Sequence, residues 1–534
     1  MAVEVEPIEP PLHAVRAVRA PTARRHPRWR LDRFELAVLV AFAALSMWVV
    51  ALDLFQVVEH GRHWTGTDGV FIDDQLQYLA WIRSASQHLL VSNLFVLRHT
   101  PADYFQPAIV ISGALTALGV APWLSLLLWK PVAVGACFFA VRAYVARSMS
   151  DRWARRAALV LALFFGSFTV IYGTVGTIGD IFPGFLSWGY MFGLVGIAAM
   201  AAALLAHQRA LVRGRIAWGP GLLGALASSM HPWNGELVIL IVLGAELIMN
   251  ARRRPLRAWV AQPALTVALT AAPLAYYWLL ARFDESWRLA SHATKHSFPL
   301  WSIGLELLPL VLCALPAYRG RPRDFLSAAT RVWPPAALAL FMLSSTQLSG
   351  SPLHAFQGIT VPLAVLAVEG VRRIGFDRLR HRFVWATLAI ALFTIPAVID
   401  QANGARKLVA PQPGNPTFIA PGESRALAYL AADPQPGGVI SRSYLSALVP
   451  GETGRHTFNG DCIWSEPNCV GRETVGHRLF DGALTPTAAR TFVLTNRARF
   501  LLADCRTTAN LEQLLGPVIE SVHRFGCAAV YEVR

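Results

Sequence analysis

Two adjacent aspartates, Asp73 and Asp74, are the residues of this sequence best suited to chemistry. They lie in the segment Val70–Arg83, whose remaining residues predict an aromatic amphipathic helix. One carboxylate could deprotonate an acceptor hydroxyl, while the pair, or a divalent cation such as Mg²⁺ or Mn²⁺ bound there, handles phosphate charge. The pair could instead cap a helix that begins near Gln75, because aspartate is a good N-cap residue. The sequence leaves both interpretations open.

A second polar group interrupts a long apolar run. His231, Asn234 and Glu236 stand in the stretch His-Pro-Trp-Asn-Gly-Glu, where the proline breaks the helical pattern. An acidic residue in or near a membrane span normally has a partner or a task, so substrate contact is one interpretation. Hydrogen-bonded packing between helices is the other.

A third group of charged residues lies near the C-terminus. Arg455, Asp461, Glu466 and Arg472 are close together in the sequence. They could line a groove for an acceptor that faces the preceding part of the chain. Ordinary surface charge explains them equally simply, because charged residues mostly lie at the surface.

The composition indicates what class of protein contains these residues. Of the 534 residues, 54% are hydrophobic and only 15% are charged, and the mean hydropathy is +0.43. These values exclude a disordered chain and favour a polytopic membrane protein. The net charge of +15 does not require a nucleic acid as partner, because the basic residues form short clusters between apolar runs.

The apolar runs predict about eleven transmembrane helices. Residues 1–33 are expected to form a disordered basic cytoplasmic tail, and residues 34–400 the membrane domain. The first run is too long for a signal-peptide core and is expected to remain uncleaved. The eleven predicted spans are 35–55, 123–147, 154–172, 185–206, 216–230, 235–250, 258–281, 300–318, 333–348, 353–370 and 383–400.

Basic clusters fix the expected orientation. Every cluster falls on a cytoplasmic loop if residues 105–120 do not cross the membrane but lie on its surface. These residues then belong to a first outside loop, 56–122. The run 216–250 must then be two short helices that turn outside at residues 231–234. Because the N-terminus is expected to be cytoplasmic and the number of spans is odd, the C-terminal tail is expected to lie outside. We therefore expect an integral protein of the plasma (inner) membrane.

Residues 401–534 form a more polar tail, for which we expect an extracytoplasmic α/β domain. Its four cysteines favour two disulfides in an exported domain, with Cys462–Cys469 expected first among three possible connectivities. Cys137 and Cys313 are expected to be core residues. Helices are predicted at 423–432, 487–497 and 511–515, and strands at 438–441, 500–503, 518–522 and 528–533.

Several short motifs resemble the GT-C superfamily of integral membrane glycosyltransferases, which use polyprenyl-phosphate sugars. The Asp-Asp pair with its Tyr-Leu-Ala-Trp helix and the stretch Asp103–Pro107 look like that family's first outside loop. The segment Gly221–Pro232 is similar to its short hairpin. Val449–Arg455 and Asn459–Asp461 resemble the outside tails of bacterial members, including protein O-mannosyltransferases and aminoarabinose transferases.

The resemblance implies roles for particular residues. Asp73 or Asp74 matches the first-loop acid that serves as catalytic base or positions the acceptor. Asp180 is the only carboxylate of the next outside loop, where it would bind substrate or, with Asp74, a metal; a simple turn residue is the alternative. Where members hold the lipid phosphate with Arg or Lys, this chain has Ser351–Gln357, which offers His354 and Gln357. Arg288 is an alternative phosphate partner.

The function implied is inverting transfer of a hexosyl or pentosyl group from a polyprenyl-phosphate donor to an extracytoplasmic glycan, lipid or protein acceptor. Membrane lipids are the other expected partners. Two alternatives remain. A transporter or lipid flippase would carry charged residues in mid-span and repeated halves. A noncatalytic subunit of glycan assembly could use the same scaffold.

Overall fold

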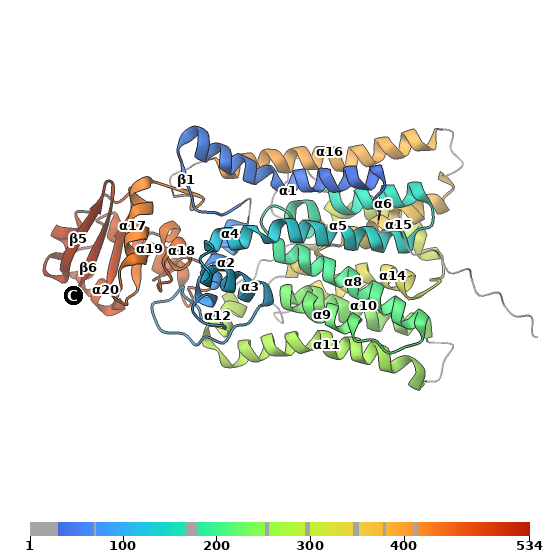
Figure 1. Ribbon diagram of the computed structural model, residues 1–534, viewed down its shortest axis with the longest axis horizontal. Coiled ribbons are helices and arrows are strands. Elements are labelled where there is room, and N and C mark those ends of the chain that lie inside the picture. The colour runs from blue at the N-terminus through green and yellow to red at the C-terminus, as the bar shows by residue number, and fades with distance from the viewer. Residues whose placement is uncertain are drawn as a thin grey trace, which may run out of the picture.

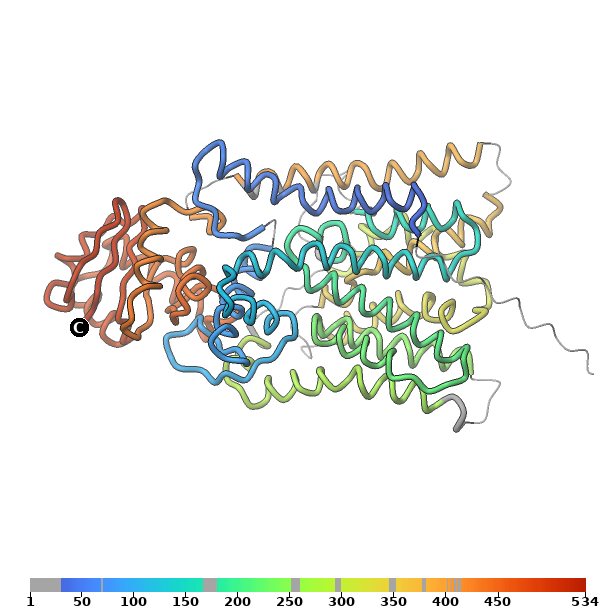
Figure 2. Tube along the Cα trace, in the orientation of Figure 1, coloured from blue at the N-terminus to red at the C-terminus, as the bar shows by residue number. Residues whose placement is uncertain are grey.

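The computed structural model is a bundle of roughly parallel helices with a mixed α/β region at one end (Figure 1). Short helices lie between the bundle and the sheet, and α1 (Arg33–His60) runs beside α16 (Arg382–Val409) along one edge. The path of the chain is easiest to follow in Figure 2. The structure describes residues 30–68, 71–166, 179–250, 256–293, 299–344, 352–376, 381–410 and 414–534.

Eight helical segments in the described part of the chain have the length and apolar composition needed to cross a membrane. An aspartate or asparagine caps several helices; α1, for example, begins after Asp32, whose carboxylate accepts from the Glu35 N–H at 2.8 Å. The eight are α1, α4–α5 (Pro122–Leu127 and Trp129–Ser148), α8 (Met191–Arg213), α10 (Pro232–Asn250), α11 (Leu256–Phe283), α13 with η3 (Leu300–Ala314 and Leu315–Arg319), α14 (Phe325–Leu343) and α16.

The predicted number of eleven spans is not confirmed by the described residues. The other three predicted spans overlap α6 (Arg152–Phe164), α9 (Gly219–Met230) and α15 (Thr360–Arg373), which have 13, 12 and 14 residues. Helices of that length extend about 18–21 Å, whereas a bilayer core is about 30 Å thick. They pack against longer helices of the bundle. Their apolar composition therefore also serves packing inside the protein.

The local predictions for the short helices agree with the structure. The helix break at His231 separates α9 from α10. Residues 107–117 form the short helix α3 (Pro107–Ala117), which is too short to be a spanning candidate. Together with α2 (Ile72–Ala85), α4 and α12 (Glu285–Ala293), it lies at the end of the bundle that faces the C-terminal region (Figure 1).

Residues 418–534 contain a four-stranded sheet of order β3-β4-β6-β5. Strands β3 and β4 are parallel and the other neighbours antiparallel. The sheet comprises β3 (Val439–Ser441), β4 (Phe500–Ala503), β5 (Ile519–Phe525) and β6 (Ala528–Val533), close to the predicted positions. The helices are α17 (Pro421–Ala432), α18 (Ser443–Thr453), α19 (Cys469–Phe480), α20 (Pro486–Asn496) and α21 (Leu511–Leu515). A two-stranded ribbon, β1 (His63–Trp64) with β2 (Phe418–Ile419), ties this region to the first loop.

Two disulfides are present in this region. Cys462 pairs with Cys469, as predicted, and Cys505 pairs with Cys527. Of the other two cysteines, Cys137 is buried and Cys313 is partly buried, and both are free.

Helix α18 attaches the C-terminal region to the first loop by packing on α2. The close approach depends on Gly451, where an added Cβ would lie 3.0 Å from the Leu79 Cβ. Gly454 ends the helix with φ +75°, a conformation that glycine adopts without strain. The Val449–Arg455 motif thus works as a docking surface for α2.

Gly451→Val is expected to weaken this docking. The added methyl groups would have to displace Leu79, and overpacking of this kind costs about 1–3 kcal/mol. Thermal unfolding of the purified protein should shift to lower temperature. Gly304→Val is the matched control, because a Cβ at Gly304 in α13 meets nothing within 4 Å. Equal unfolding temperatures for the two variants would contradict this role of Gly451.

Candidate functional site

The paired carboxylates lie inside the first turn of α2 and do not cap it. The helix begins at Ile72, and its N-cap residue, Phe71, makes no side-chain capping bond. The alternative in which Asp73 and Asp74 cap a helix beginning near Gln75 is therefore wrong. Negative charge in a first turn interacts favourably with the helix dipole, so the position itself is stable.

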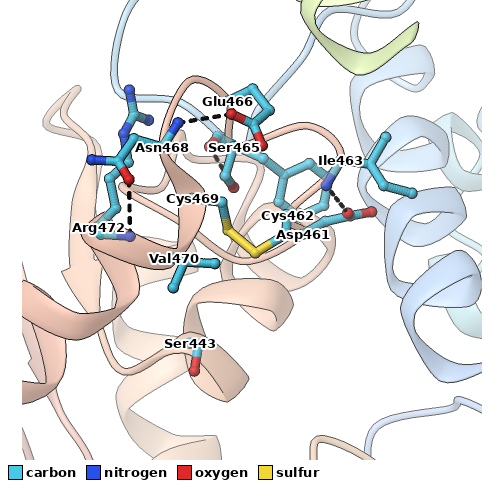
Figure 3. Close-up of a disulfide and its surroundings, with 12 residues drawn as sticks. Ser443, Asp461, Cys462, Ile463, Ser465, Glu466, Asn468, Cys469, Val470 and Arg472 are labelled. Atoms are coloured by element: carbon cyan, nitrogen blue, oxygen red, sulfur yellow. Dashed lines mark hydrogen bonds between the residues drawn. A yellow bond between two sulfur atoms is a disulfide. The ribbon is translucent and has the colours of Figure 1, made fainter. Parts of the chain in front are cut away.

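Asp73 interacts electrostatically with a carboxyl group from the far end of the sequence, that of Asp461. Asp461 is only 7% exposed, and its Oδ1 accepts a hydrogen bond from the Ile463 N–H at 2.8 Å. Burial and, to a smaller extent, the charge of Asp73 raise the pKa of Asp461 to about 7. Figure 3 shows Asp461 on the side of its loop nearest the blue helical segment of the early chain.

The two carboxyl groups differ in their proton affinity. Asp73 keeps contact with solvent, and the protein around it raises the pKa of its carboxyl by desolvation. Its charge then helps Asp461 to retain a proton up to about neutral pH. One of the two groups can therefore be ionised while the other is protonated, which is a charge state suited to proton transfer.

The elevated pKa of Asp461 predicts two effects of pH. Turnover should change as pH rises through about 7, and Asp461→Asn should abolish that change because the amide stays neutral. Since the folded-state pKa lies above the usual value of 3.8, ionisation of Asp461 destabilises the fold as pH rises from about 4 to about 7. The gain in heat stability of the variant over the native protein should therefore be larger at about pH 8 than at about pH 5. The same difference at both pH values would contradict the assignment.

Tyr190 connects the carboxylate helix to the interior of the bundle. It is the N-cap residue of α8, and its ring centroid lies 5.3 Å from that of Phe71 and 6.4 Å from that of Tyr78. The pKa of Tyr78 is raised well above 10 by burial, by Tyr190 and by the charge of Asp74, in that order. The charge of Asp74 therefore affects Tyr78, which lies beside Tyr190, whereas the charge of Asp73 affects Asp461.

Two histidines predicted to contact substrate meet beside Tyr190. The rings of His231, at the α9–α10 turn, and His354, in η5 (Pro352–Phe356), are 4.8 Å apart. Tyr190 lies 5.8 Å from the first and 6.0 Å from the second. Trp233 completes the group, 5.1 Å from His231. The fold thus brings together residues that are more than a hundred positions apart.

Several buried polar groups beside these rings lack hydrogen bonds within the described structure. They are both ring nitrogens of His231 and the side-chain amides of Asn234 and Gln357. These residues are 3%, 0% and 0% exposed. Buried polar groups are nearly always paired, so an unpaired set of this kind indicates a place where a ligand or water binds.

Glycines in α8 give this polar group its space. A Cβ at Gly196 would lie 2.4 Å from the Asn234 Nδ2, and one at Gly193 would lie 3.3 Å from the Gln357 Oε1. Larger residues at either position would press on the amides. The polar group is hereafter called the polar cluster: His231, Asn234, His354 and Gln357.

Three other predicted site residues lie on neighbouring or separate elements. Glu236 is half-buried near the start of α10, two residues after Asn234, and Arg288 is exposed on α12. Asp180 lies in the short helix η2 (Gly179–Ile181), and its side chain is outside the described residues.

Arg455 is used within the C-terminal region. Its guanidinium donates to the carbonyl oxygens of Leu430, Asp433 and Gln435 at 2.8, 2.7 and 2.6 Å. It also lies over the Phe500 ring at 4.5 Å. The side chain therefore holds α17 and its following turn against the sheet. This contact network is structural, and we do not assign Arg455 to the polar cluster.

One buried ion pair was not anticipated from the sequence. Lys130 in α5 pairs with Asp68, and both side chains are 1% exposed. The Asp68 N–H donates to the Gln75 Oε1 at 2.7 Å, which fixes the start of α2. Asp53 of α1 is also fully buried, and its charge interacts with Asp68 and Lys130. The sequence offered one indication of this pair, a lysine within an apolar run, because charged residues in such runs normally have a function or a partner.

The described residues contain no group of three or more His, Cys, Asp or Glu side chains placed to hold a metal ion. Of the two expected ligands, Asp74 lies in α2, and the side chain of Asp180 is not among the described ones. The divalent cation therefore stays a prediction.

No family model and no curated protein matches this sequence. Solved structures with a similar fold exist. The Archaeoglobus fulgidus oligosaccharyltransferase has a TM-score of 0.55 and 14% identity over 90% of this chain and 70% of its own. The mycobacterial arabinofuranosyltransferase AftD has a TM-score of 0.53 and 15% identity over 94% of this chain and 40% of its own.

ArnT from Cupriavidus metallidurans, solved with undecaprenyl phosphate, covers nearly the whole of both chains. It has a TM-score of 0.51 and 13% identity over 93% of this chain and 97% of its own. All three are GT-C glycosyltransferases. The helical bundle, the helices of the first loop and the C-terminal region together therefore have the GT-C fold.

Proposed function

We propose that this protein is an integral membrane glycosyltransferase. It transfers a hexosyl or pentosyl group from a polyprenyl-phosphate donor to an acceptor hydroxyl on the extracytoplasmic side. The observation that carries the proposal is the position of Tyr190, between the carboxylate helix α2 and the polar cluster. The helix that carries a base for the acceptor and a set of groups for the donor phosphate then both approach one ring.

Asp73 is the base in this proposal. It takes the proton from the acceptor hydroxyl, whose oxygen forms a bond to the anomeric carbon as the bond from that carbon to the phosphate oxygen breaks. Displacement in one step inverts the anomeric configuration. Asp461, protonated up to about pH 7, donates a hydrogen bond to the acceptor and leaves Asp73 as the ionised partner.

The polar cluster holds the departing phosphate. His231, Asn234 and Gln357 have hydrogen-bonding groups that the described protein leaves unused, and such groups stabilise charge best in a site that excludes water. ArnT was solved with undecaprenyl phosphate, which supports a lipid phosphate as the leaving group. A divalent cation on Asp74 and Asp180 would add positive charge there. No step of the mechanism depends on it.

The membrane topology belongs to the same proposal. Residues 1–33 are a cytoplasmic tail, and the α/β region is extracytoplasmic, with the plasma membrane around the bundle. Two disulfides in that region fit an oxidising compartment. The lipid tail keeps the donor in the bilayer, so the reaction needs no nucleotide on that side.

The test is transfer of radiolabelled sugar by the purified chain in lipid vesicles. A panel of polyprenyl-phosphate hexoses and pentoses serves as donors, and cell-envelope glycans, lipids and peptides as acceptors. Labelled product, with release of polyprenyl phosphate, supports the proposal. Movement of intact donor across the vesicle membrane would indicate the flippase alternative. Donor binding without bond cleavage would indicate a noncatalytic subunit.

A further inference from the structure

A disulfide closes the loop that follows Asp461. Cys462 is the next residue, and it pairs with Cys469, the first residue of α19; Figure 3 shows this bridge beside Asp461. Helix α19 is itself held in place, because Leu479 and Phe480 at its far end are buried in the core beside the sheet. The disulfide therefore ties the backbone next to Asp461 to a fixed helix.

Hydrogen bonds fold the loop tightly around Asp461. Its carbonyl oxygen accepts from the Trp464 N–H at 3.1 Å and from the Ser465 N–H at 2.7 Å. Its Oδ1 accepts from the Ile463 N–H at 2.8 Å, the bond drawn in Figure 3. The last of these bonds also fixes the direction of the buried carboxyl group.

A buried asparagine joins this loop to the first loop. The Asn93 Nδ2 donates to the Trp464 carbonyl oxygen at 2.9 Å, and its Oδ1 accepts from the Phe95 N–H at 2.9 Å. The Ser465 hydroxyl adds a bond to the Phe95 carbonyl oxygen at 3.1 Å. Residues 93–95 follow α2, the helix that carries Asp73, in the same first loop. The Asp461 loop is therefore attached on one side to α19 and on the other to the first loop.

The second disulfide holds a different part of the region. Cys505 follows β4, and Cys527 stands in the turn between β5 and β6, so this bridge joins the ends of two neighbouring strands. It takes part in none of the bonds around Asp461 described above. The two disulfides thus form a matched pair, of which one holds the candidate site and the other holds the sheet.

Tight attachment of Asp461 matters for the proposed reaction. Asp461 and Asp73 are almost four hundred residues apart in the sequence, so their alignment depends on what holds each segment. A disulfide restricts the conformations that its loop can adopt. Misplacement of a reacting group by about 1 Å lowers a rate by as much as about 10²-fold.

We propose that the Cys462–Cys469 disulfide and Asn93 are positioning groups of the transfer reaction, which hold the carboxyl group of Asp461 where it meets the acceptor. Neither group touches a reactant. The inference rests on the proposed function and adds a condition to it: full activity requires the oxidised Cys462–Cys469 pair.

The first measurement is transfer turnover in lipid vesicles. A chain with both Cys462→Ser and Cys469→Ser should turn over about 10–100-fold more slowly, with an unchanged KM for the donor. A chain with both Cys505→Ser and Cys527→Ser is the matched control and should keep its turnover. Asn93→Ala leaves both disulfides in place and should also slow turnover, which provides a second test if the first chain does not fold. Native turnover without the Cys462–Cys469 bridge would overturn the inference.

The second measurement needs no transfer. Asp461→Asn is added to each variant, and thermal unfolding is followed at about pH 5 and about pH 8. Burial and the charge of Asp73 on α2 raise the pKa of Asp461 in the native loop, so the gain in heat stability from Asp461→Asn is larger at the higher pH. A freed loop lets Asp461 ionise in water like an ordinary carboxyl group, and this pH-dependent gain should shrink.

The pH-dependent gain separates positioning from a purely structural role. A disulfide that only stabilised the fold would lower the unfolding temperature at both pH values and leave the gain unchanged. We expect the gain to shrink without the Cys462–Cys469 bridge and with Asn93→Ala, and to persist without the Cys505–Cys527 bridge. A gain that survives in all three backgrounds would overturn the inference. Absence of transfer by the native chain would refute the proposed function, whereas loss of the gain would still show that this loop holds Asp461.

Discussion

Asp73→Asn is expected to lower the transfer turnover about 10³-fold, because a positioned general base contributes about 10²–10⁴-fold to rate. The donor should still bind with unchanged affinity, since Asp73 acts on the acceptor side of α2. The fold should not suffer, because the charged form of this carboxylate is disfavoured by burial and the amide has no charge. Turnover, donor binding and thermal unfolding are measured on the same preparation.

Asp74→Asn is the matched comparison for that experiment. The two residues are neighbours in the same helical turn, but the charge of Asp74 acts on Tyr78 rather than on Asp461. We expect Asp74→Asn to change the interaction with the donor more than the turnover of bound substrate. Full activity of Asp73→Asn together with inactivity of Asp74→Asn would reverse the assignment of the base.

The sequence predicted the features that depend on neighbouring residues. The four strands of the sheet are recognisable because short apolar runs stand between turn residues. The Cys462–Cys469 pair is close in sequence, and the helix break at His231 follows from the proline beside it.

Features that depend on tertiary contacts could not be predicted from the sequence. Asp461 was one of four charged candidates, and only the docking of α18 on α2 brings it to Asp73. Tyr190 carried no signal at all, because its importance lies in what it contacts. The count of eleven spans is not confirmed by the described residues, in which eight helical segments are long and apolar enough to cross a membrane.

His231 and His354 show how far residue chemistry alone can reach. His354 was a candidate because histidine at the end of a span can bind phosphate, and His231 because it stands with Asn234 and Glu236 where the helical pattern breaks. Their proximity could not be foreseen, since η5 approaches the α9–α10 turn only through the packing of the bundle. The unpartnered amide of Gln357 is likewise visible only once its surroundings are known.

His231→Phe is expected to lower turnover about 10²–10³-fold, the usual effect of removing one donor from a site that stabilises developing charge. Phenylalanine keeps a ring against Tyr190, Trp233 and His354, so the packing is retained. His231→Gln, which keeps a hydrogen-bond donor, should recover part of the activity.

Thermal stability separates this role from a structural one. A histidine that held the helices together would lose hydrogen bonds on replacement, and the protein would unfold at lower temperature. Both nitrogens of His231 are buried without partners in the described structure, so Phe removes a desolvation cost and breaks no bond. We therefore expect the inactive variant to be at least as heat-stable as the native chain. A marked loss of stability would show that His231 serves the fold and would remove it from the donor site.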